Sequence, residues 1–415
     1  MNLILSRPKT EAEAGLAAQF EALGGLNAAR RAAFAQFAEA GLPNKRVEAW
    51  HFTDLRGAMD TALPLAGDAA GPVGKPESLM PGACVIALVD GRYSPAHSDD
   101  LPAHVALCTD TGPMATKDSV LALNHAFAAH PLHLEIAAGC AVDQPIHIAH
   151  LISQGQPKAL FARVAVTVGA GAQVCLVESA SGMAGPHQIN LALELTLGAD
   201  AKCSHIADFA AANSVLVNSL SARLGGQADL HSFAMLSGGA LLRRQMFVAL
   251  EGEGGNVTLN GVQLGRGEEH IDTSLVVAHM AGHGVSRETF RTILDGEATG
   301  VYQGKVVVHP HAQKTDGKMM SKAVLLSDHA VMDNKPELEI FADDVVCGHG
   351  ATVGALDEDQ IFYCAARGIA KPEAEGLLLQ AFADELIEAL PDAAAIPHMS
   401  QRVADWLRTR KDVAQ

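Results

Sequence analysis

The sequence predicts a mainly β protein, in which a parallel β-helix core is flanked by N-terminal and C-terminal α-helical regions. Glycine corners with strand-like residues on both sides recur along the middle of the chain, and successive corners are 29, 27, 27 and 30 residues apart. Aromatic residues make up only 4% of the chain while glycines number 39, which suits narrow stacked turns filled by small aliphatic side chains. The corner glycines are Gly169, Gly198, Gly225, Gly252 and Gly282. A β-sandwich is the rival fold, but it needs tight two-residue hairpins more often than this stretch supplies them.

The first part of the chain is expected to be helical. Residues 11–42 carry apolar side chains at spacings of three and four, and the pair Gly24-Gly25 divides them into two helices. Trp50 and Phe52 follow in the segment EAWHFTDL. We interpret these aromatics as a hydrophobic staple that holds the helical arm to the body, in preference to a ligand site.

A linker separates this arm from the core. Residues 60–82 are rich in Pro, Gly and Ala, as linkers are, and a short strand over 84–89 and a helix over 119–130 follow. We therefore expect three parts: an N-terminal helical region with linker (1–125), the β-helix core (126–354) and a C-terminal helical domain (355–415).

The last coil carries the candidate site. Residues 336–344, PELEIFADD, alternate apolar and acidic positions as a half-buried strand does, and Gly348, Gly350 and Gly354 mark a bend or a close approach of another group. Cys347 and His349 would then point to one face of the strand, with Cα atoms roughly 6.5–7 Å apart. Two donors are too few for a closed metal site, which takes about four. The pair is therefore either an inert thiol beside an incidental histidine or half of a site completed by another protein, and residue types alone favour the inert interpretation.

The C-terminal region is expected to form amphipathic helices. An acidic start near residue 357 and Gly368 bound one helix, and another begins near Lys371 and ends before Pro391. Leu378, Phe382 and Leu386 line one face of the second helix. That stripe either docks on the coil or binds a partner, and spacing alone does not separate these alternatives.

Composition excludes several classes of function. The net charge of −17 and the lack of basic runs argue against nucleic acid. Seven scattered cysteines, an odd number, indicate a reducing compartment. No signal peptide and no apolar run of about 18 residues is visible. We expect a cytoplasmic protein that binds no membrane.

Motifs for catalysis are missing. The segment at 300–306 lacks the spacing and the Ser or Thr of a nucleotide-binding P-loop, and no hydrolase elbow, zinc-protease helix or dinucleotide fingerprint occurs. His309 with His311, and Cys203 with His205, have metal-ligand spacing, but we interpret the former as an exposed corner and the latter as packing.

The terminal block gives a specific resemblance. MSKAVLLSDHAVMDNKPELEIFADDVVCGHGATVGALDEDQIFYCAARGI, with EAWHFTDL near the start and EAEGLLLQAF near the end, resembles the SufB/SufD family of the Suf iron–sulfur cluster assembly system. The sequence CGHGATVG fits the SufD branch better than the SufB branch, and the likeness covers nearly the whole chain.

The resemblance implies a right-handed parallel β-helix and a non-catalytic scaffold subunit. Such a subunit forms a heterodimer with SufB through the coil terminus, binds the SufC ATPase through its C-terminal helices, and supports iron acquisition. His349, carried over by motif, would be a ligand of a transient iron–sulfur cluster shared with SufB, with Cys347 beside it in the same block. Leu378, Phe382 and Leu386 would be the SufC-binding stripe.

Other expectations stay open. The chain alone could form a homodimer, no nucleotide is expected to bind to it, and flavin involvement is undetermined. The alternative functions are a β-helix carbohydrate-active enzyme, which would need convergent carboxylates in a groove, and a purely structural interaction protein.

Overall fold

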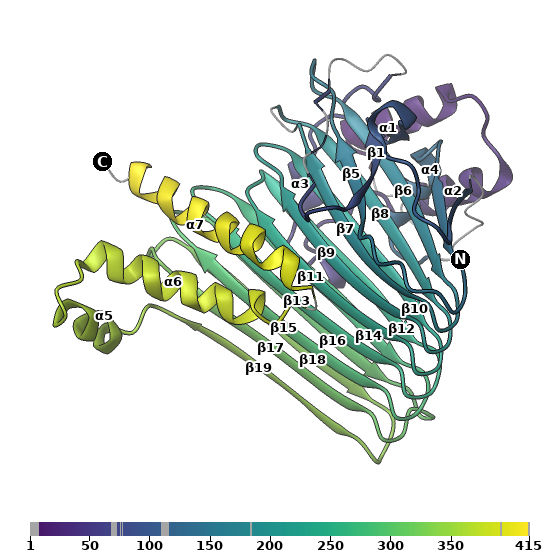
Figure 1. The fold of residues 1–415 in the computed structure, drawn as a ribbon. Coiled ribbons are helices and arrows are strands. Elements are labelled where there is room, and N and C mark those ends of the chain that lie inside the picture. The colour runs from purple at the N-terminus through teal and green to yellow at the C-terminus, as the bar shows by residue number, and fades with distance from the viewer. Residues whose placement is uncertain are drawn as a thin grey trace, which may run out of the picture.

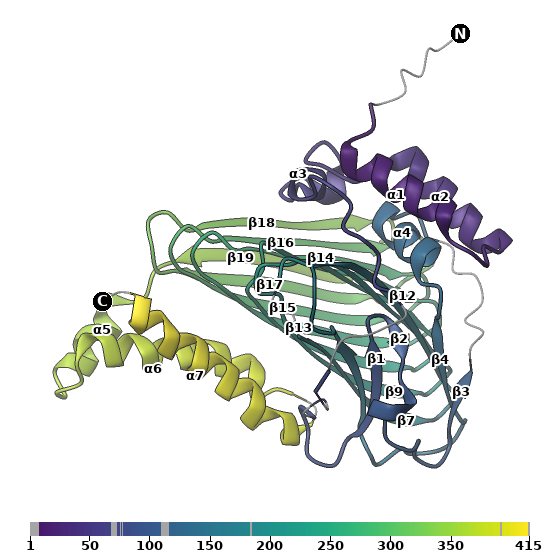
Figure 2. The same cartoon turned by 90° about the horizontal axis from the view of Figure 1, so that it is seen from above.

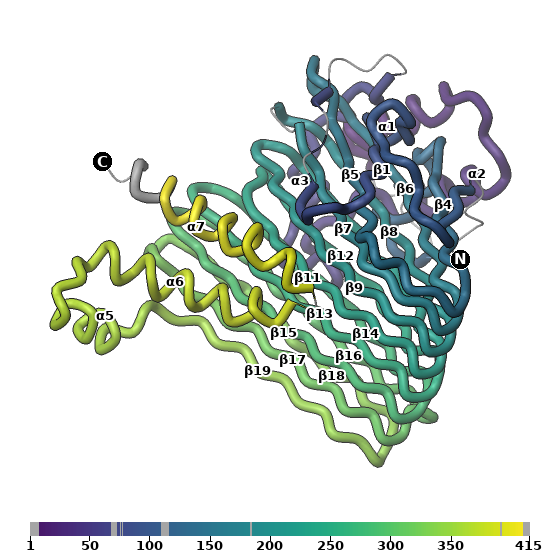
Figure 3. The backbone as a smooth tube through the Cα atoms, in the orientation of Figure 1, coloured from purple at the N-terminus to yellow at the C-terminus, as the bar shows by residue number. Residues whose placement is uncertain are grey.

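The chain coils into two long facing sheets, as the computed structural model shows for residues 8–67, 73–74, 76, 78–108, 116–182, 185–390 and 392–413 (Figures 1 and 3). About eight turns stack into a parallel β-helix flanked by helices at both ends, so the predicted fold class is confirmed. Ladder pairs within both sheets are parallel except β1 with β2 and β3 with β4, which rules out the rival hairpin sandwich.

Successive strands alternate between the two sheets. Within the described residues the first sheet has ten strands in the order β19-β17-β15-β13-β11-β9-β7-β5-β1-β2, and the second has nine in the order β18-β16-β14-β12-β10-β8-β6-β4-β3. The strands of the first sheet are β1 (Cys84–Val89), β2 (Arg92–Tyr93), β5 (Ile146–Leu151), β7 (Gln173–Ser181), β9 (Lys202–Ala210), β11 (Asp229–Ser237), β13 (Asn256–Gly265), β15 (Val285–Leu294), β17 (Asp316–Leu325) and β19 (Val346–Gly354). Those of the second are β3 (Val105–Cys108), β4 (Leu132–Ile136), β6 (Ala159–Val168), β8 (Gln188–Leu197), β10 (Val215–Leu224), β12 (Leu241–Leu250), β14 (His270–His279), β16 (Thr299–Val308) and β18 (Val331–Ile340).

The predicted corners coincide with tight stacking of one turn on the next. A Cβ added to Gly198 would lie 2.7 Å from the backbone nitrogen of Ala170, and one added to Gly252 would lie 2.0 Å from that of Gly226. These glycines are required because the backbones of adjacent corners nearly touch. The predicted period therefore equals the number of residues in one coil.

The core fills the space between the sheets. Aliphatic side chains from both sheets form one continuous cluster, including Leu193, Leu224, Leu259 and Val306. Strands β1–β3 extend the sheets although they precede residue 126, and the predicted domain limits at 126 and 355 stay predictions.

The N-terminal helices cover the outer face of the second sheet (Figure 2). They are α1 (Glu11–Ala22), α2 (Ala28–Ala40), α3 (Leu55–Ala58) and α4 (Ser119–Phe127), with short 3-10 turns η1 (Glu48–Trp50) and η2 (Pro95–His97). The break between α1 and α2 contains Gly24 and Gly25, as predicted. The predicted linker 60–82 lies partly outside the described residues.

The EAWHFTDL segment ties this region to four strands. Trp50 is 1% exposed and stacks on the guanidinium of Arg243, 3.8 Å from the ring centre. The Thr53 hydroxyl bonds Asp272, the amide of Gln303 donates to the Glu48 carbonyl (3.0 Å), and the Glu48 carboxylate pairs with Lys335. These partners lie on β12, β14, β16 and β18. Trp50 thus packs on the body as the predicted staple requires, with polar bonds added, whereas Phe52 is half-buried and its ring contacts His51.

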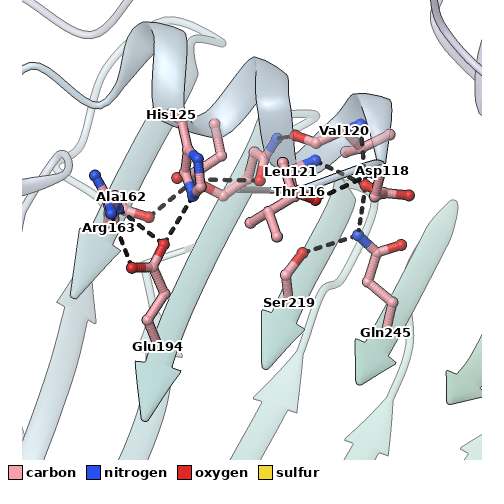
Figure 4. A network of polar contacts seen from close by, with 12 residues as sticks. Thr116, Asp118, Val120, Leu121, His125, Ala162, Arg163, Glu194, Ser219 and Gln245 are labelled. Atoms are coloured by element: carbon pink, nitrogen blue, oxygen red, sulfur yellow. Dashed lines mark hydrogen bonds and ion pairs between the residues drawn. The ribbon is translucent and has the colours of Figure 1, made fainter. Parts of the chain in front are cut away.

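A buried polar network fixes α4 to the same sheet (Figure 4). Arg163 donates two hydrogen bonds of 2.8 Å to the Glu194 carboxylate, and a ring nitrogen of His125 in α4 lies 2.7 Å from the same carboxylate. Burial alone would raise the pKa of Glu194, but the bonds from His125 and Arg163 outweigh it and lower the pKa. The amide of Gln245 donates to both Asp118 and Ser219 at 3.0 Å, which anchors the start of α4.

The described chain ends in three helices, of which the second and third lie on the outer face of the first sheet (Figure 2). They are α5 (Glu358–Ala365), α6 (Lys371–Ile387) and α7 (Ile396–Val413), with the turn η3 (Ala393–Ala395). Leu379, Ala383 and Ile387 of α6 pack with Phe233 and Ile293 of the sheet. No helix among the described residues is long and apolar enough to cross a membrane.

Candidate functional site

The coil ends in an open turn made of β18 and β19. Each of these strands terminates its sheet and pairs with a single neighbour, β16 or β17 (Figure 1). Large apolar side chains are exposed around this turn: Val331, Ile340, Phe341, Val346 and Val353. An unpaired edge with apolar side chains is where a strand of another chain can add.

Cys347 and His349 occupy this last turn on the side that faces the coil interior. In the ladder Cys347 is opposite Gly317 and His349 is opposite Met319, and Met319 is buried in the core. Cys347 is half-buried against the core, whereas His349 is exposed. The shared face predicted from the alternation is therefore present, and the end of the coil leaves His349 accessible.

The environment of Cys347 disfavours its thiolate. Burial raises the pKa of the thiol, and the carboxylates of Asp316 and Glu288 raise it further, against a backbone hydrogen bond at Gly317 that lowers it. A metal that bound this sulfur would have to displace the proton. Among the residues with described positions, no group of three or more His, Cys, Asp or Glu side chains could hold a metal ion. Cys347 and His349 therefore form no complete metal site with the other described side chains.

Glu288 is a buried carboxyl group that sequence reasoning missed. It belongs to the ladder column that continues through Met319 to His349, and it is fully buried. Burial raises its pKa to about 7, despite the opposing influence of Ser286 and Arg287. The hydroxyl of the nearby Tyr302, which is fully buried, has no hydrogen-bond partner among the described residues. Strand alternation does not reveal them, because polar and apolar residues occur at both sets of alternate positions in β15 (VSRETFRTIL) and β16 (TGVYQGKVVV).

The predicted helical stripe is largely occupied by the chain's own packing. Leu386 is 7% exposed, and Phe382 is partly buried with the guanidinium of Arg291 4.6 Å from its ring centre. Leu378 is half-buried, whereas its neighbour Leu377 is 53% exposed. On α5, Phe362 and Tyr363 are 73% and 59% exposed. The helical domain therefore docks on its coil and still presents apolar side chains outward.

Of the two remaining metal-like pairs, His309 and His311 lie in the corner after β16, directly beneath the corner of the last turn, where His311 is exposed and His309 is half-buried. His205 is fully buried in mid-coil, where it bonds Ser232 (2.9 Å) and pairs with Glu178, and Cys203 is 3% exposed. The packing interpretation of Cys203 and His205 is confirmed.

A β-helix carbohydrate-active enzyme would need acidic residues in a groove, and one groove lies on the outer face of the second sheet. Its volume is about 520 Å³, and Glu194 and Glu251 line it. Glu194 is held by Arg163 with a lowered pKa, and Glu251 pairs with Arg223 at 2.9 Å. A glycosidase acid needs a raised pKa, so this pair does not fit that chemistry.

Comparison with known proteins places the fold in a described family. Residues 150–382 match the family model "SUF system FeS cluster assembly, SufBD core domain". The iron–sulfur cluster assembly protein SufD of Escherichia coli is 31% identical over 387 residues, which covers 90% of this chain and 91% of that protein.

Two further relatives are more distant. An iron–sulfur cluster assembly SufBD family protein of Synechocystis is 27% identical over 88% of this chain and 87% of its own length. The chloroplastic protein ABCI7 of Arabidopsis thaliana is 28% identical over 62% of this chain and 56% of its own length. Since the match with the Escherichia coli protein covers 90% of this chain, it includes at least part of both helical ends as well as the coil.

Proposed function

Because this chain belongs to the SufBD family of the SUF iron–sulfur cluster assembly system, we propose that it is a scaffold subunit on which a cluster forms at a subunit interface. In this proposal it pairs with SufB through the open end of its coil, binds the SufC ATPase through its C-terminal helices, and supports iron acquisition. The subunit itself is non-catalytic, and the cluster is cargo shared with SufB.

The observation that carries the proposal is that an unpaired sheet edge and an incomplete set of metal donors lie on the same strand. The last turn exposes unpaired backbone groups and apolar side chains, and the same strand carries Cys347 and His349. Pairing with a second coil would cover the edge and bring foreign donors to these two residues. A thiolate from the partner and His349 would then both reach the nascent cluster.

The ligand types suit a site that must release its product. An imidazole is a weaker ligand to cluster iron than a thiolate and is exchanged more easily. His349 is exposed, so it can reach iron without rearrangement of the coil. Cys347 would join as a second donor after losing its proton, which its burial and the nearby carboxylates oppose.

For SufC, the stripe of Leu378, Phe382 and Leu386 stays a prediction. Since Phe382 and Leu386 also pack on the coil, charged substitutions there would act on stability as well as on binding. Leu377 is exposed beside the stripe and gives the cleaner test.

The proposal is tested by substituting His349→Ala in a complex reconstituted with SufB and SufC under anaerobic conditions. We expect complex formation and the unfolding midpoint to stay unchanged, while iron and acid-labile sulfide per complex fall at least tenfold. His311→Ala, which removes an exposed histidine elsewhere on the coil, is the matched control. Unchanged iron and sulfide in His349→Ala would remove this residue from the role, and failure of the parent chain to bind SufB would remove the scaffold proposal.

A further inference from the structure

The interior of the middle turns contains a charged side chain from each sheet. Glu178 of β7 and Arg244 of β12 both point into the coil, because their alternate neighbours Leu176 and Met246 belong to the aliphatic core. Glu178 is 1% exposed and Arg244 is fully buried. Charged side chains are rarely buried unless they are paired, so each of these two needs partners inside the coil.

Glu178 has partners on both sides. Nε2 of His150 lies 3.3 Å from Oε1 of the carboxylate, and Nε2 of His205 lies 3.5 Å from Oε2. The amide of Asn218 also donates to Oε1, at 3.1 Å. Burial alone would raise the pKa of Glu178, but the hydrogen bonds from His150 and His205 outweigh it and lower the pKa. Glu178 is therefore ionised at neutral pH, and its Oε2 atom, which has only the longest of these contacts, can accept a further hydrogen bond.

Arg244 has fewer partners than its guanidinium can use. Nη1 donates to the side-chain oxygen of Asn218, whereas Nε and Nη2 have no hydrogen-bond partner among the described residues. Burial lowers the pKa of Arg244 to about 10, so the group keeps its charge at neutral pH. A guanidinium carries five N–H groups, and leaving several of them unbonded in a core is unfavourable. The free nitrogens of this fully buried side chain therefore point to a bound acceptor.

The acceptor has to suit both charges, which attract each other inside the coil. Asn218 already joins Glu178 to Arg244 by one route, because its amide nitrogen bonds the carboxylate and its oxygen bonds the guanidinium. Oε2 of Glu178 and the free nitrogens of Arg244 can share a second molecule that accepts and also donates, as water does. An anion only accepts. It would also leave a net negative charge in an aliphatic core, because Glu178 and Arg244 already balance each other.

We propose that a buried water molecule bridges Arg244 and Glu178, and that this hydrated bridge joins the two sheets in the middle of the coil. The water accepts from Nε or Nη2 of Arg244 and donates to Oε2 of Glu178. Together with Asn218 it closes a ring of hydrogen bonds between β7 of the first sheet and β10 and β12 of the second. The inference goes beyond the proposed function and does not depend on it.

A crystal structure of this chain that shows ordered water tests the bridge directly. We expect a water molecule within hydrogen-bond distance of both Arg244 and Oε2 of Glu178. A direct bond from the free nitrogens of Arg244 to Glu178 or to a backbone carbonyl would overturn the proposal. Crystals soaked in bromide give a second arm. An anomalous peak beside Arg244 would show that the occupant is an anion, and the proposal would be wrong.

A measurement in solution tests the same bridge without crystals. Deuteron relaxation dispersion counts the internal water molecules that have long residence times. Arg244→Met removes the donors and keeps a long side chain, so this variant should hold at least one fewer such water than the parent. Arg223→Met, which changes an exposed arginine of the neighbouring strand β10, should hold as many as the parent. Equal numbers in the parent and in folded Arg244→Met would overturn the proposal. If Arg244→Met does not fold, the crystal structure of the parent still decides the question.

Discussion

His279 should make the coil measurably less stable in mild acid. It lies in the coil interior at the end of β14, it is fully buried, and neither ring nitrogen has a hydrogen-bond partner among the described residues. Burial lowers its pKa from 6.5 to about 4. The unfolded chain therefore binds a proton between these values that the folded chain does not bind, and stability falls as the pH drops through this window.

The size of the effect follows from the two pKa values. At 1.36 kcal/mol for each pH unit, the difference between 6.5 and about 4 amounts to about 3.4 kcal/mol. The contribution is fully present above the unfolded pKa, about 2 kcal/mol of it is lost by about pH 5, and all of it is lost well below about pH 4.

The assay is urea unfolding, followed by far-ultraviolet circular dichroism, at a series of pH values. His279→Leu removes the titration and leaves no bonded partner behind, so it should be as stable as the parent near neutral pH and should lose stability less steeply in acid. His311→Leu, at an exposed histidine, should follow the parent. If the parent and His279→Leu lose stability in parallel, the reasoning is refuted.

Two further predictions concern packing. Arg163→Leu should lower the free energy of unfolding by about 3–5 kcal/mol, because Glu194 then stays buried without its main partner. Adding Glu194→Leu should restore most of this loss. If urea unfolding shows the double variant to be no more stable than Arg163→Leu, the prediction is contradicted. Leu386→Ala should cost about 2–5 kcal/mol because the side chain is buried between α6 and the coil. Leu377→Ala should change stability by less than about 0.5 kcal/mol because the side chain is mostly in solvent. Equal thermal midpoints for these two variants would show that α6 does not dock in solution as described.

Much of the coil could be predicted because its corners require one residue type, glycine. Gly198 and Gly252 recur where backbones of adjacent turns nearly touch, and only glycine fits there. The spacing of the corners can therefore be counted directly in the sequence. The same signal fades near Val307, where no glycine stands at the corner, and yet β16 and β18 remain paired in parallel.

The orientation of side chains could not be predicted equally well. Alternation placed Cys347 and His349 on one face, but it did not say that this face was the interior, because neither set of alternate positions in VCGHGATVG is clearly the more apolar one. Glu288 and Tyr302 stayed hidden for the same reason. On α6 the run Leu377, Leu378, Leu379 makes several helical faces apolar, so the face that docks could not be chosen from spacing.

The EAWHFTDL segment has a consequence for how the molecule assembles. Its bonds to Arg243, Asp272, Gln303 and Lys335 join residues 194, 219, 255 and 287 positions apart along the chain. A stack of coils can otherwise grow by local steps, each turn templating the next. This segment is synthesised early, but all of its partners are present only after almost the whole coil has been made. Contacts between residues so far apart along the chain form slowly. Docking of this segment thus marks completion of the monomer, and a chain truncated before the final coils would keep the contact of Trp50 with Arg243 but lose the bonds to Gln303 and Lys335.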